Sequence, residues 1–181
     1  MFGGDWRGFD EQVARLDEGV RAGKRVVKPF AYQAVSASPA DLKACAAIFA
    51  GHLFAAAPPL RKLSRGHAKK IRLGYVSGEL REQATAALAA GLYEAHDRDR
   101  FELVAFDSGF DDGSPMRRRL EAAFDKFIAI DNLSDLAAAE RIRDEEIDIL
   151  INLNGYFGTV RMGVFAHRPA SIQVNYLGFP G

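Results

Sequence analysis

Two amide side chains stand at the end of an apolar stretch in the second half of the sequence. Asn152 and Asn154 flank Leu153, directly after residues 147–151, which are apolar except for Asp148. Amide groups that become buried at the end of a strand need hydrogen-bond partners. Two interpretations stay open from the sequence: these amides orient a hydroxyl group of a ligand, or they tie down their own loop.

A second candidate segment is the turn at residues 77–83. It follows the short apolar run 71–77, which is typical of a buried strand, and precedes the Ala- and Leu-rich residues 82–95, which favour a helix. In open α/β sheets the ligand usually lies just past the carboxyl ends of such strands. We therefore expect a functional site at this turn.

Most well-known catalytic patterns are absent from the sequence. It contains no phosphate-binding P-loop, no nucleophile-elbow serine and no Cys or His pairs at metal spacing, so no metal site is expected. A solvated role is predicted for His96, in a polar helix end, and a structural role for His167, at another helix end. Asp111, Asp112 and Gly113 are interpreted as a turn and not as acidic ligands.

The elements that must position these residues begin with a helical segment. Apolar residues at helical spacing predict a helix over residues 9–22, with Gly23 as its C-terminal cap. Residues 24–35 are expected to be irregular, and Ser38-Pro39 to start a second helix, in which Cys45 is a buried spacer. Residues 58–70 are expected to be a linker, so residues 1–69 are predicted to form a helical linker segment with two helices.

From residue 71 onward, strands are expected to alternate with helices. The later strands are predicted at residues 101–107, 127–130, 147–153 and 172–177. Helices are predicted after Ser114-Pro115, with Met116, Leu120 and Phe124 on one face; from Ser134, with Leu136, Ala139 and Ile142 facing in; and over residues 159–166. Residues 147–153 are almost continuously apolar and are expected to lie inside the sheet. This alternation predicts an α/β fold with a parallel, doubly wound sheet of about five strands over residues 70–181.

Composition favours an ordinary globular protein. The chain has 181 residues, 48% of them hydrophobic and 27% charged, and its single cysteine fits a reducing compartment. No signal peptide and no membrane span are expected, so the predicted location is cytoplasmic. The net charge is zero, but residues 1–70 carry 12 Lys and Arg against 6 Asp and Glu. Nucleic acid is not the expected partner, because this basic part has no basic run with interleaved aromatic residues.

Several segments together carry a resemblance to a known family. Residues 70–77 look like the opening of the catalytic region in the O-linked N-acetylglucosamine transferase family, which includes the SPINDLY-like proteins. Further matches follow in the same order at residues 100–106, 111–117, 147–151, 154–156 and 165–181. Residues 5–10 also resemble the segment that joins tetratricopeptide repeats to the catalytic region in bacterial relatives.

The resemblance implies a GT-B glycosyltransferase that moves N-acetylglucosamine from UDP to Ser or Thr of a protein. Such an enzyme has two Rossmann-like halves that face each other across the active cleft. The matched segments correspond to the N-terminal half, whereas in the family most of the UDP-binding groups come from the C-terminal half. The chain is therefore expected to be inactive alone, to need no cofactor beyond the UDP-GlcNAc donor, and to meet a protein acceptor.

The sequence departs from the family pattern at the cleft itself. Gln83 stands where the family has a histidine, and Ala87 stands where it has a second one. Glutamine does not titrate near neutral pH, so it cannot serve as a general base. No catalytic residue is assigned. The residues expected to bind or position substrate are Ser77, Gln83, Thr85, Asn154, Tyr156 and Gly178.

Two alternatives to an enzyme remain open. The first is a non-catalytic GT-B half that binds a protein segment, or pairs with itself or another chain through an uncovered edge strand. The changes at Gln83 and Ala87 favour it, as does a sequence that ends at a Gly-Phe-Pro-Gly turn, in what resembles the middle of a connection. The second is a flavodoxin-like domain for a small ligand, which rests on architecture alone.

Overall fold

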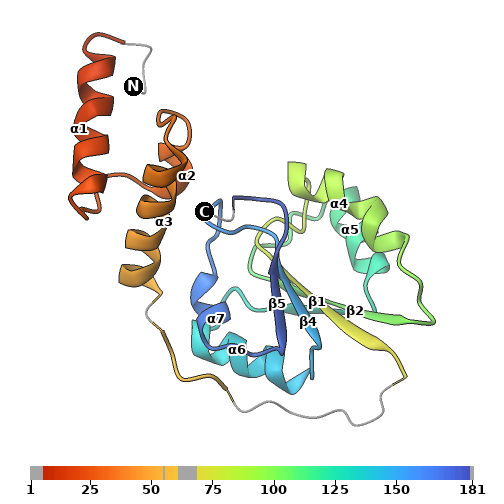
Figure 1. Cartoon of the computed structure of the whole chain (residues 1–181). Coiled ribbons are helices and arrows are strands. Elements are labelled where there is room, and N and C mark those ends of the chain that lie inside the picture. Colours follow the sequence, from red (N-terminus) through yellow and green to blue (C-terminus); the bar gives the residue numbers. More distant parts are fainter. Residues whose placement is uncertain (1–5, 55, 61–68, 180–181) are drawn as a thin grey trace. The chain divides into compact units, whose positions relative to one another are not determined.

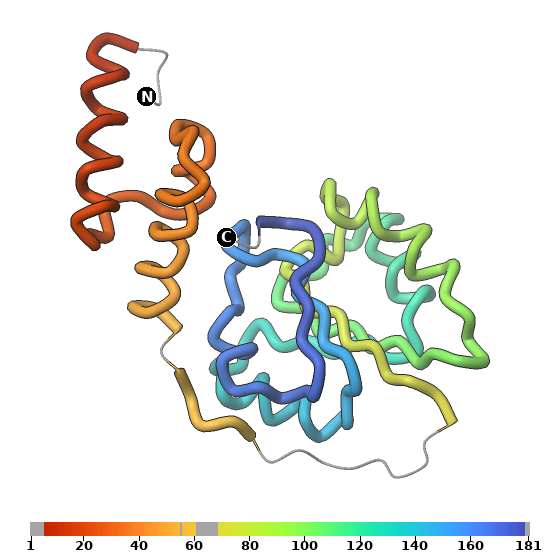
Figure 2. Tube along the Cα trace, in the orientation of Figure 1, coloured from red at the N-terminus to blue at the C-terminus, as the bar shows by residue number. Residues whose placement is uncertain are grey.

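The computed structural model describes residues 6–54, 56–60 and 69–179. These residues form two compact units, one within residues 6–54 and the other within residues 56–179. Figures 1 and 2 trace the chain through both units. The linker predicted over residues 58–70 lies largely outside the described residues. Within the described part of the chain, no helix is long and apolar enough to cross a membrane.

The first unit contains three helices. Helix α1 (Phe9–Arg21) ends as predicted at Gly23, which has a φ of 72° and donates its N–H to the carbonyl of Val20. Helix α3 (Pro39–Leu53) also begins as predicted, because the Ser38 hydroxyl accepts a hydrogen bond from the Asp41 N–H at 3.2 Å.

The irregular segment predicted over residues 24–35 is wrong in part. It contains the one-turn helix α2 (Pro29–Tyr32), which begins at Pro29. Proline suits this position because its φ is fixed near the helical value and its missing N–H would have no helical partner there. A helix of four residues is too short to leave a periodic pattern in the sequence.

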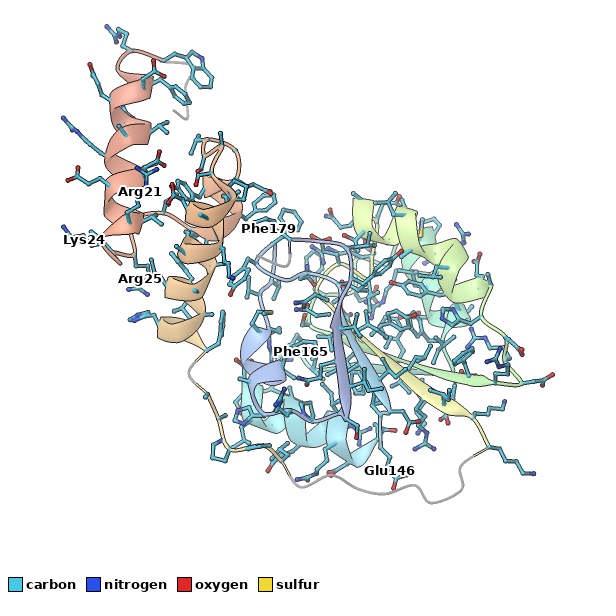
Figure 3. The ribbon with its side chains drawn as sticks, in the orientation of Figure 1. Arg21, Lys24, Arg25, Glu146, Phe165 and Phe179 are labelled. Atoms are coloured by element: carbon cyan, nitrogen blue, oxygen red, sulfur yellow. The ribbon has the colours of Figure 1, made fainter. Side chains whose placement is uncertain are left out.

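A small core holds the three helices of this unit together. Val20, Tyr32 and Cys45 are its buried members, and the Tyr32 hydroxyl donates a 2.5 Å hydrogen bond to Asp17. Cys45 is buried as expected, and burial raises the pKa of its thiol. An ion pair between Arg21 (Figure 3) and Asp41, with 2.7 Å between Nη2 and Oδ2, links α1 to α3.

The second unit is built from five strands and four helices. In chain order they are β1 (Ile71–Ser77), α4 (Ala84–Glu94), β2 (Phe101–Asp107), α5 (Pro115–Ala123), β3 (Lys126–Ala129), α6 (Asp135–Asp144), β4 (Ile149–Asn152), α7 (Met162–Ala166) and β5 (Ile172–Asn175). Every strand and helix predicted from residue 71 onward is present, and the ends differ from the prediction by a few residues.

The strands form one parallel sheet in the order β3-β2-β1-β4-β5. This confirms the predicted α/β architecture with a Rossmann-like sheet. The order reverses at β1, so the connections from β1 and β4 leave toward opposite faces of the sheet. Strand β4 lies inside the sheet as predicted, between β1 and β5, and β1 is the central strand.

Helices cover the two faces of the sheet in pairs (Figure 1). Helices α4 and α5 bury one core, and α6 and α7 bury the other. In α5 the predicted face is confirmed, because Leu120, Phe124 and Met116 pack into the first core. In α6, Ala139 and Ile142 are buried as predicted, but Leu136 is 45% exposed. The buried stripe of α6 also includes Ala138, which places Leu136 at its margin in the first turn.

An aromatic cluster beneath α4 contains an unpaired polar group. The rings of Tyr75 and Tyr93 meet edge to face with 5.0 Å between their centroids, and Phe124 contacts both. The Tyr75 hydroxyl lies 3.2 Å from Nε2 of His96, whereas the Tyr93 hydroxyl is fully buried with no hydrogen-bond partner among the described residues. Burial raises the pKa of both phenols, that of Tyr75 to about 12.

We predict that Tyr93→Phe stabilises the chain by about 1 kcal/mol, because it removes a buried hydroxyl that no group satisfies. The matched change Tyr75→Phe is expected to bring no gain, because it breaks the contact with His96. Since the unfolded phenols lose their protons near pH 10, the unfolding free energy of the wild type should fall as the pH rises from about 10 to about 12. Urea unfolding of the three proteins across this pH range checks both expectations. Equal unfolding free energies for the two variants would contradict the first expectation. A wild-type unfolding free energy that does not fall over this pH range would contradict the second.

Candidate functional site

The carboxyl ends of β1 and β4 lie side by side at the point where the strand order reverses. Val76 pairs with Asn152, and the Leu153 N–H donates to the Val76 carbonyl at 3.1 Å. Beyond these residues the two connections separate, and Asn154 bridges them. Its Oδ1 accepts a 2.9 Å hydrogen bond from the N–H of Gly78. Two of the predicted segments, after residue 77 and after residue 152, are therefore joined by a direct bond.

The two asparagines play different parts in this arrangement. Asn152 ties down its own loop: its Oδ1 accepts from the N–H groups of Asn154 and Gly155, and its Nδ2 donates to Asn175 at 3.0 Å. Asn154 is 3% exposed, and its Nδ2 has no hydrogen-bond partner among the described residues. Of the two interpretations left open by the sequence, the loop-tying role fits Asn152, and Asn154 retains a spare donor.

The turn after β1 buries two of its polar side chains. Ser77 is fully buried, and its hydroxyl accepts a 3.0 Å hydrogen bond from the N–H of Glu79. The Thr85 hydroxyl, in the first turn of α4, donates to Oε2 of Glu79. Ser77 and Thr85 therefore both contact Glu79, which is itself 8% exposed.

Glu79 is the member of this group that the sequence interpretation missed. A carboxylate directly after a buried strand, within a turn already expected to be functional, is the signal that could have identified it. Its importance depends on burial and on Thr85, neither of which a sequence pattern reveals.

Gln83 occupies a different environment from its neighbours. It is the exposed N-cap residue of α4, and its side chain makes no capping hydrogen bond. The adjacent Glu82 N–H donates at 2.9 Å to Asp112, which also accepts from Ser114 within the predicted Asp111–Asp112–Gly113 turn. The interpretation of these aspartates as turn residues is confirmed. Desolvation raises the pKa of Asp112, but hydrogen bonds from the Glu82 backbone and from Ser114 outweigh it, so the pKa lies below its usual value.

A buried ion pair supports the turn at residues 77–83, after β1. Arg117 of α5 pairs with Asp107 at the end of β2 and donates a 3.1 Å hydrogen bond to the Leu80 carbonyl. Burial lowers the pKa of Arg117, but hydrogen bonds to Asp107 and Glu121 outweigh it and hold that pKa above its usual value. This guanidinium is therefore committed to structure and not to a ligand.

Tyr156 and Gly178 lie where the loops after β4 and β5 meet. The Tyr156 N–H donates to the Phe179 carbonyl at 2.7 Å, and the Phe179 N–H donates to the Asn154 carbonyl at 3.2 Å. Gly178 has a φ of 56°, and a Cβ there would lie 2.5 Å from the Asn154 carbonyl oxygen. The structure thus brings Ser77, Thr85, Asn154, Tyr156 and Gly178 into one connected group, with Gln83 at its exposed margin.

A solvated role was predicted for His96 and a structural role for His167, and the two residues lie in different settings. His96 follows α4 near the start of β2, away from the carboxyl ends of the strands where the candidate site lies. Its Nδ1 lies 2.6 Å from the Leu92 carbonyl, so Nδ1 donates there and Nε2 accepts from Tyr75. His167 caps the C-terminus of α7, and its carbonyl accepts from the Leu60 N–H. No cluster of three or more potential metal ligands occurs within residues 6–54, 56–60 and 69–179.

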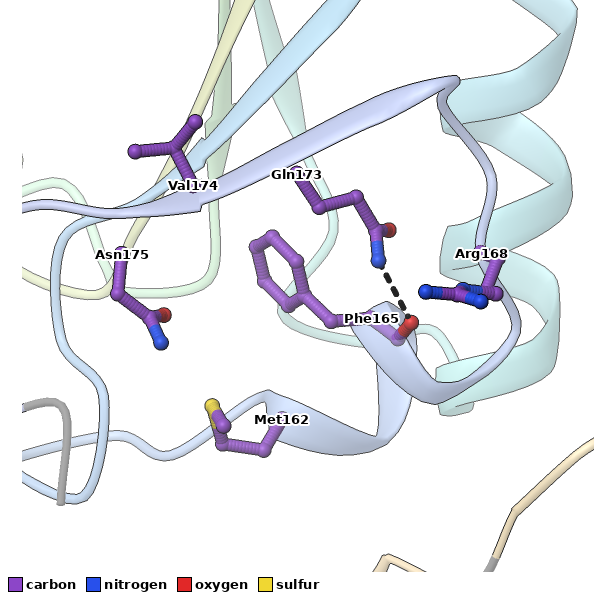
Figure 4. A pocket seen from close by; sticks show the side chains of 6 residues that line it. All are labelled: Met162, Phe165, Arg168, Gln173, Val174 and Asn175. Carbon is purple, nitrogen blue, oxygen red and sulfur yellow. Dashed lines mark hydrogen bonds between the residues drawn. The ribbon is translucent and has the colours of Figure 1, made fainter.

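A pocket of about 240 Å³ lies between α7 and β5 (Figure 4). Its lining residues are Met162, Phe165, Arg168, Gln173, Val174 and Asn175. Gln173 spans it and donates a 3.1 Å hydrogen bond to the Phe165 carbonyl. None of the predicted site residues lines this pocket. We place the candidate site at the ends of β1 and β4, because the reversal of strand order and the buried polar group both occur there.

The comparisons with known proteins agree with this architecture. The family model described as glycosyl transferase family 41 matches residues 55–181. The chain belongs to this family. Its structure superposes on that of an O-GlcNAc transferase mutant from Thermobaculum terrenum with a TM-score of 0.74 and 25% identity, covering 92% of this chain and 35% of that one.

Two curated relatives cover most of the same region. A probable UDP-N-acetylglucosamine–peptide N-acetylglucosaminyltransferase, SEC, from Arabidopsis thaliana is 35% identical over 116 residues, which is 64% of this chain and 12% of the relative. The UDP-N-acetylglucosamine–peptide N-acetylglucosaminyltransferase of Caenorhabditis elegans is 35% identical over 120 residues, or 66% of this chain and 10% of the relative. The sequence therefore spans about a tenth of the length of these relatives.

We predict that Gly178→Ala destabilises the second unit by about 2 kcal/mol more than Gly113→Ala does. Both glycines have positive φ values, 56° and 64°, so both changes carry the strain of a left-handed alanine. A Cβ at Gly113 meets nothing within 4 Å, whereas one at Gly178 collides with backbone oxygens of the β4 loop. Urea unfolding of the two variants measures the difference. Equal losses would show that the β4 and β5 loops are not packed as described.

Proposed function

We propose that this chain forms the acceptor-side half of a protein O-GlcNAc transferase, which transfers N-acetylglucosamine from UDP-GlcNAc to Ser or Thr of a protein. The observation that carries the proposal is the family 41 match over residues 55–181, in which the strand ends at the reversal of sheet order carry a connected polar group. The relatives named as peptide N-acetylglucosaminyltransferases and the structural match support the same activity.

The residues of the site suit positioning rather than proton transfer. An inverting transfer needs a hydroxyl held in line with the anomeric carbon and stabilisation of the leaving UDP. Ser77, Thr85, Asn154, Tyr156 and Gly178 would shape the acceptor side, and Gln83 would donate or accept a hydrogen bond at its exposed margin. No cofactor beyond the sugar-nucleotide donor is proposed. We further propose a cytoplasmic protein in which residues 1–69 link tetratricopeptide repeats to the Rossmann-like part.

The 181-residue polypeptide is expected to show no transfer alone. In the O-linked N-acetylglucosamine transferase family, which it resembles, the C-terminal half supplies most of the UDP-binding groups. The test is a chimera in which residues 56–179 replace the equivalent segment of the Thermobaculum terrenum O-GlcNAc transferase. Transfer of radiolabelled N-acetylglucosamine to a serine peptide by the chimera supports the proposal. A folded chimera without transfer, or transfer by the 181-residue chain alone, contradicts it.

Within this chimera we predict that Gln83→Ala lowers kcat/KM by about tenfold, the value of one or two positioning hydrogen bonds. Gln83→His should avoid the loss expected for Gln83→Ala. It should also add a pH dependence centred near pH 6.5, which the Gln83 protein lacks. The matched control is Gly91→Ala, at an exposed position of the same helix with open space around it. If Gln83→Ala behaves like Gly91→Ala, Gln83 has no role in transfer.

The second candidate is a non-catalytic half that pairs with another copy of itself, and exposed apolar residues on an edge strand favour it. Ile172 and Val174 of β5 are 53% and 42% exposed, and they share the sheet face of Ile149 and Ile151. Within the sheet of the described residues, strand β5 is paired on one side only, so its other edge can accept another strand.

If this second function holds, the mass of the 181-residue protein should rise with concentration in sedimentation equilibrium. Val174→Lys should then give a monomer, because a charged side chain on an edge opposes pairing. The control Leu136→Lys places the same charge on the similarly exposed Leu136 of α6, which packs on the other face of the sheet. A concentration-independent monomer mass for the wild type would exclude self-pairing.

A further inference from the structure

The spare donor of Asn154 lies beside a carboxylate oxygen and beneath a glycine. A Cβ at Gly158 would lie 3.2 Å from Asn154 Nδ2 and 3.2 Å from Glu79 Oε1. The two polar atoms therefore border the same small space, and a side chain at position 158 would fill it. Gly158 itself is exposed and has a φ of 64°, so the residue that lies over this space carries no side chain.

The other polar side-chain atom of each residue, Asn154 Oδ1 and Glu79 Oε2, already has a hydrogen-bond partner within the fold. Asn154 Oδ1 is occupied by the Gly78 N–H, which orients Nδ2 as a donor. Glu79 Oε2 is occupied by the Thr85 hydroxyl. A buried amide N–H₂ without a partner is rare in native proteins, because it forfeits hydrogen bonds that it would make with water. An adjacent donor and acceptor match one chemical group, the hydroxyl, which accepts and donates at the same time.

We propose that Asn154 Nδ2 and Glu79 Oε1, with Gly158 above them, form a subsite for a substrate hydroxyl. The proposal rests on the function proposed above, since that reaction offers two hydroxyl sources: the acceptor serine or threonine, and the hydroxyls of N-acetylglucosamine. The subsite makes Gly158 a specificity-determining position. A side chain there would lie 3.2 Å from both polar atoms and would crowd a hydroxyl bound between them.

The test follows the Asn154 side-chain amide directly in the 181-residue protein by NMR. The N–H₂ pair is assigned by its loss in Asn154→Asp, which keeps an oxygen for the Gly78 N–H but replaces the spare donor by an acceptor. The ¹⁵N-labelled protein is titrated at millimolar concentration with N-acetylglucosamine, with a serine peptide and with the same peptide carrying alanine. A shift with the sugar identifies a sugar hydroxyl, and a shift with the serine but not the alanine peptide identifies the acceptor hydroxyl.

Gly158→Ala is expected to weaken the identified binding by roughly tenfold or more, because its methyl group fills the space. Gly113→Ala carries the same positive-φ strain at an open position, so binding should remain within about twofold of wild type. The dispersion of the amide spectrum shows whether each variant is folded. Absence of a shift with all ligands, or equal effects of the two glycine variants, would overturn the subsite.

The chimera separates this proposal from the transferase proposal. If the chimera transfers the sugar and neither Asn154→Asp nor Gly158→Ala changes its KM, the subsite is wrong while the transferase function stands. If the N–H₂ pair responds to a ligand but the folded chimera transfers nothing, the subsite stands and the transferase function is wrong.

Discussion

The second unit depends on one hydrogen bond at the point where its strand order reverses. Strands β1 and β4 are neighbours, but their connections leave toward opposite faces of the sheet. Such a divergence opens a gap between the loops, with backbone groups that must find partners. Asn154 closes this gap, because its Oδ1 accepts from the Gly78 N–H. Its own carbonyl accepts from Phe157 and Phe179, so one residue connects the loops after β1, β4 and β5.

Around this bridge, the polar groups of the β1 turn are held from several directions. The Leu80 carbonyl accepts from Arg117 below, the Glu82 N–H donates to Asp112 beside it, and Glu79 accepts from Thr85 in α4. Because each of these bonds joins residues that are distant in sequence or belong to different elements, the turn has little freedom to rearrange. A preorganised site of this kind orients a substrate without spending binding energy on its own ordering.

The sequence predicted the fold well because local patterns determine it. The apolar runs of β1 and β2 and the Ser-Pro starts of α3 and α5 are visible in short windows, and these elements form where expected. Very short elements and features set by distant contacts were harder to predict. Helix α2 is too short to show a period, and Leu136 lies at the margin of a buried stripe that only the packing of α6 defines. Glu79 was missed because its burial depends on α4 and the β4 loop, which follow it in the chain.

The site residues differ in how strongly the fold constrains them, and this separates structural from chemical roles. Gly178 is constrained by backbone contacts and Asn154 Oδ1 by its bond to the Gly78 N–H, so the glycine and this oxygen follow from folding whether or not a ligand binds. Gln83 and Ala87 are both exposed in the first turn of α4, and Gln83 makes no capping bond. A histidine at either position would cost the fold little, since exposed substitutions away from special features usually change stability by less than about 0.5 kcal/mol. Folding therefore does not explain why Gln83 and Ala87 stand where the O-linked N-acetylglucosamine transferase family has histidines. Any constraint on these two positions must come from a group that contacts the exposed N-terminal end of α4.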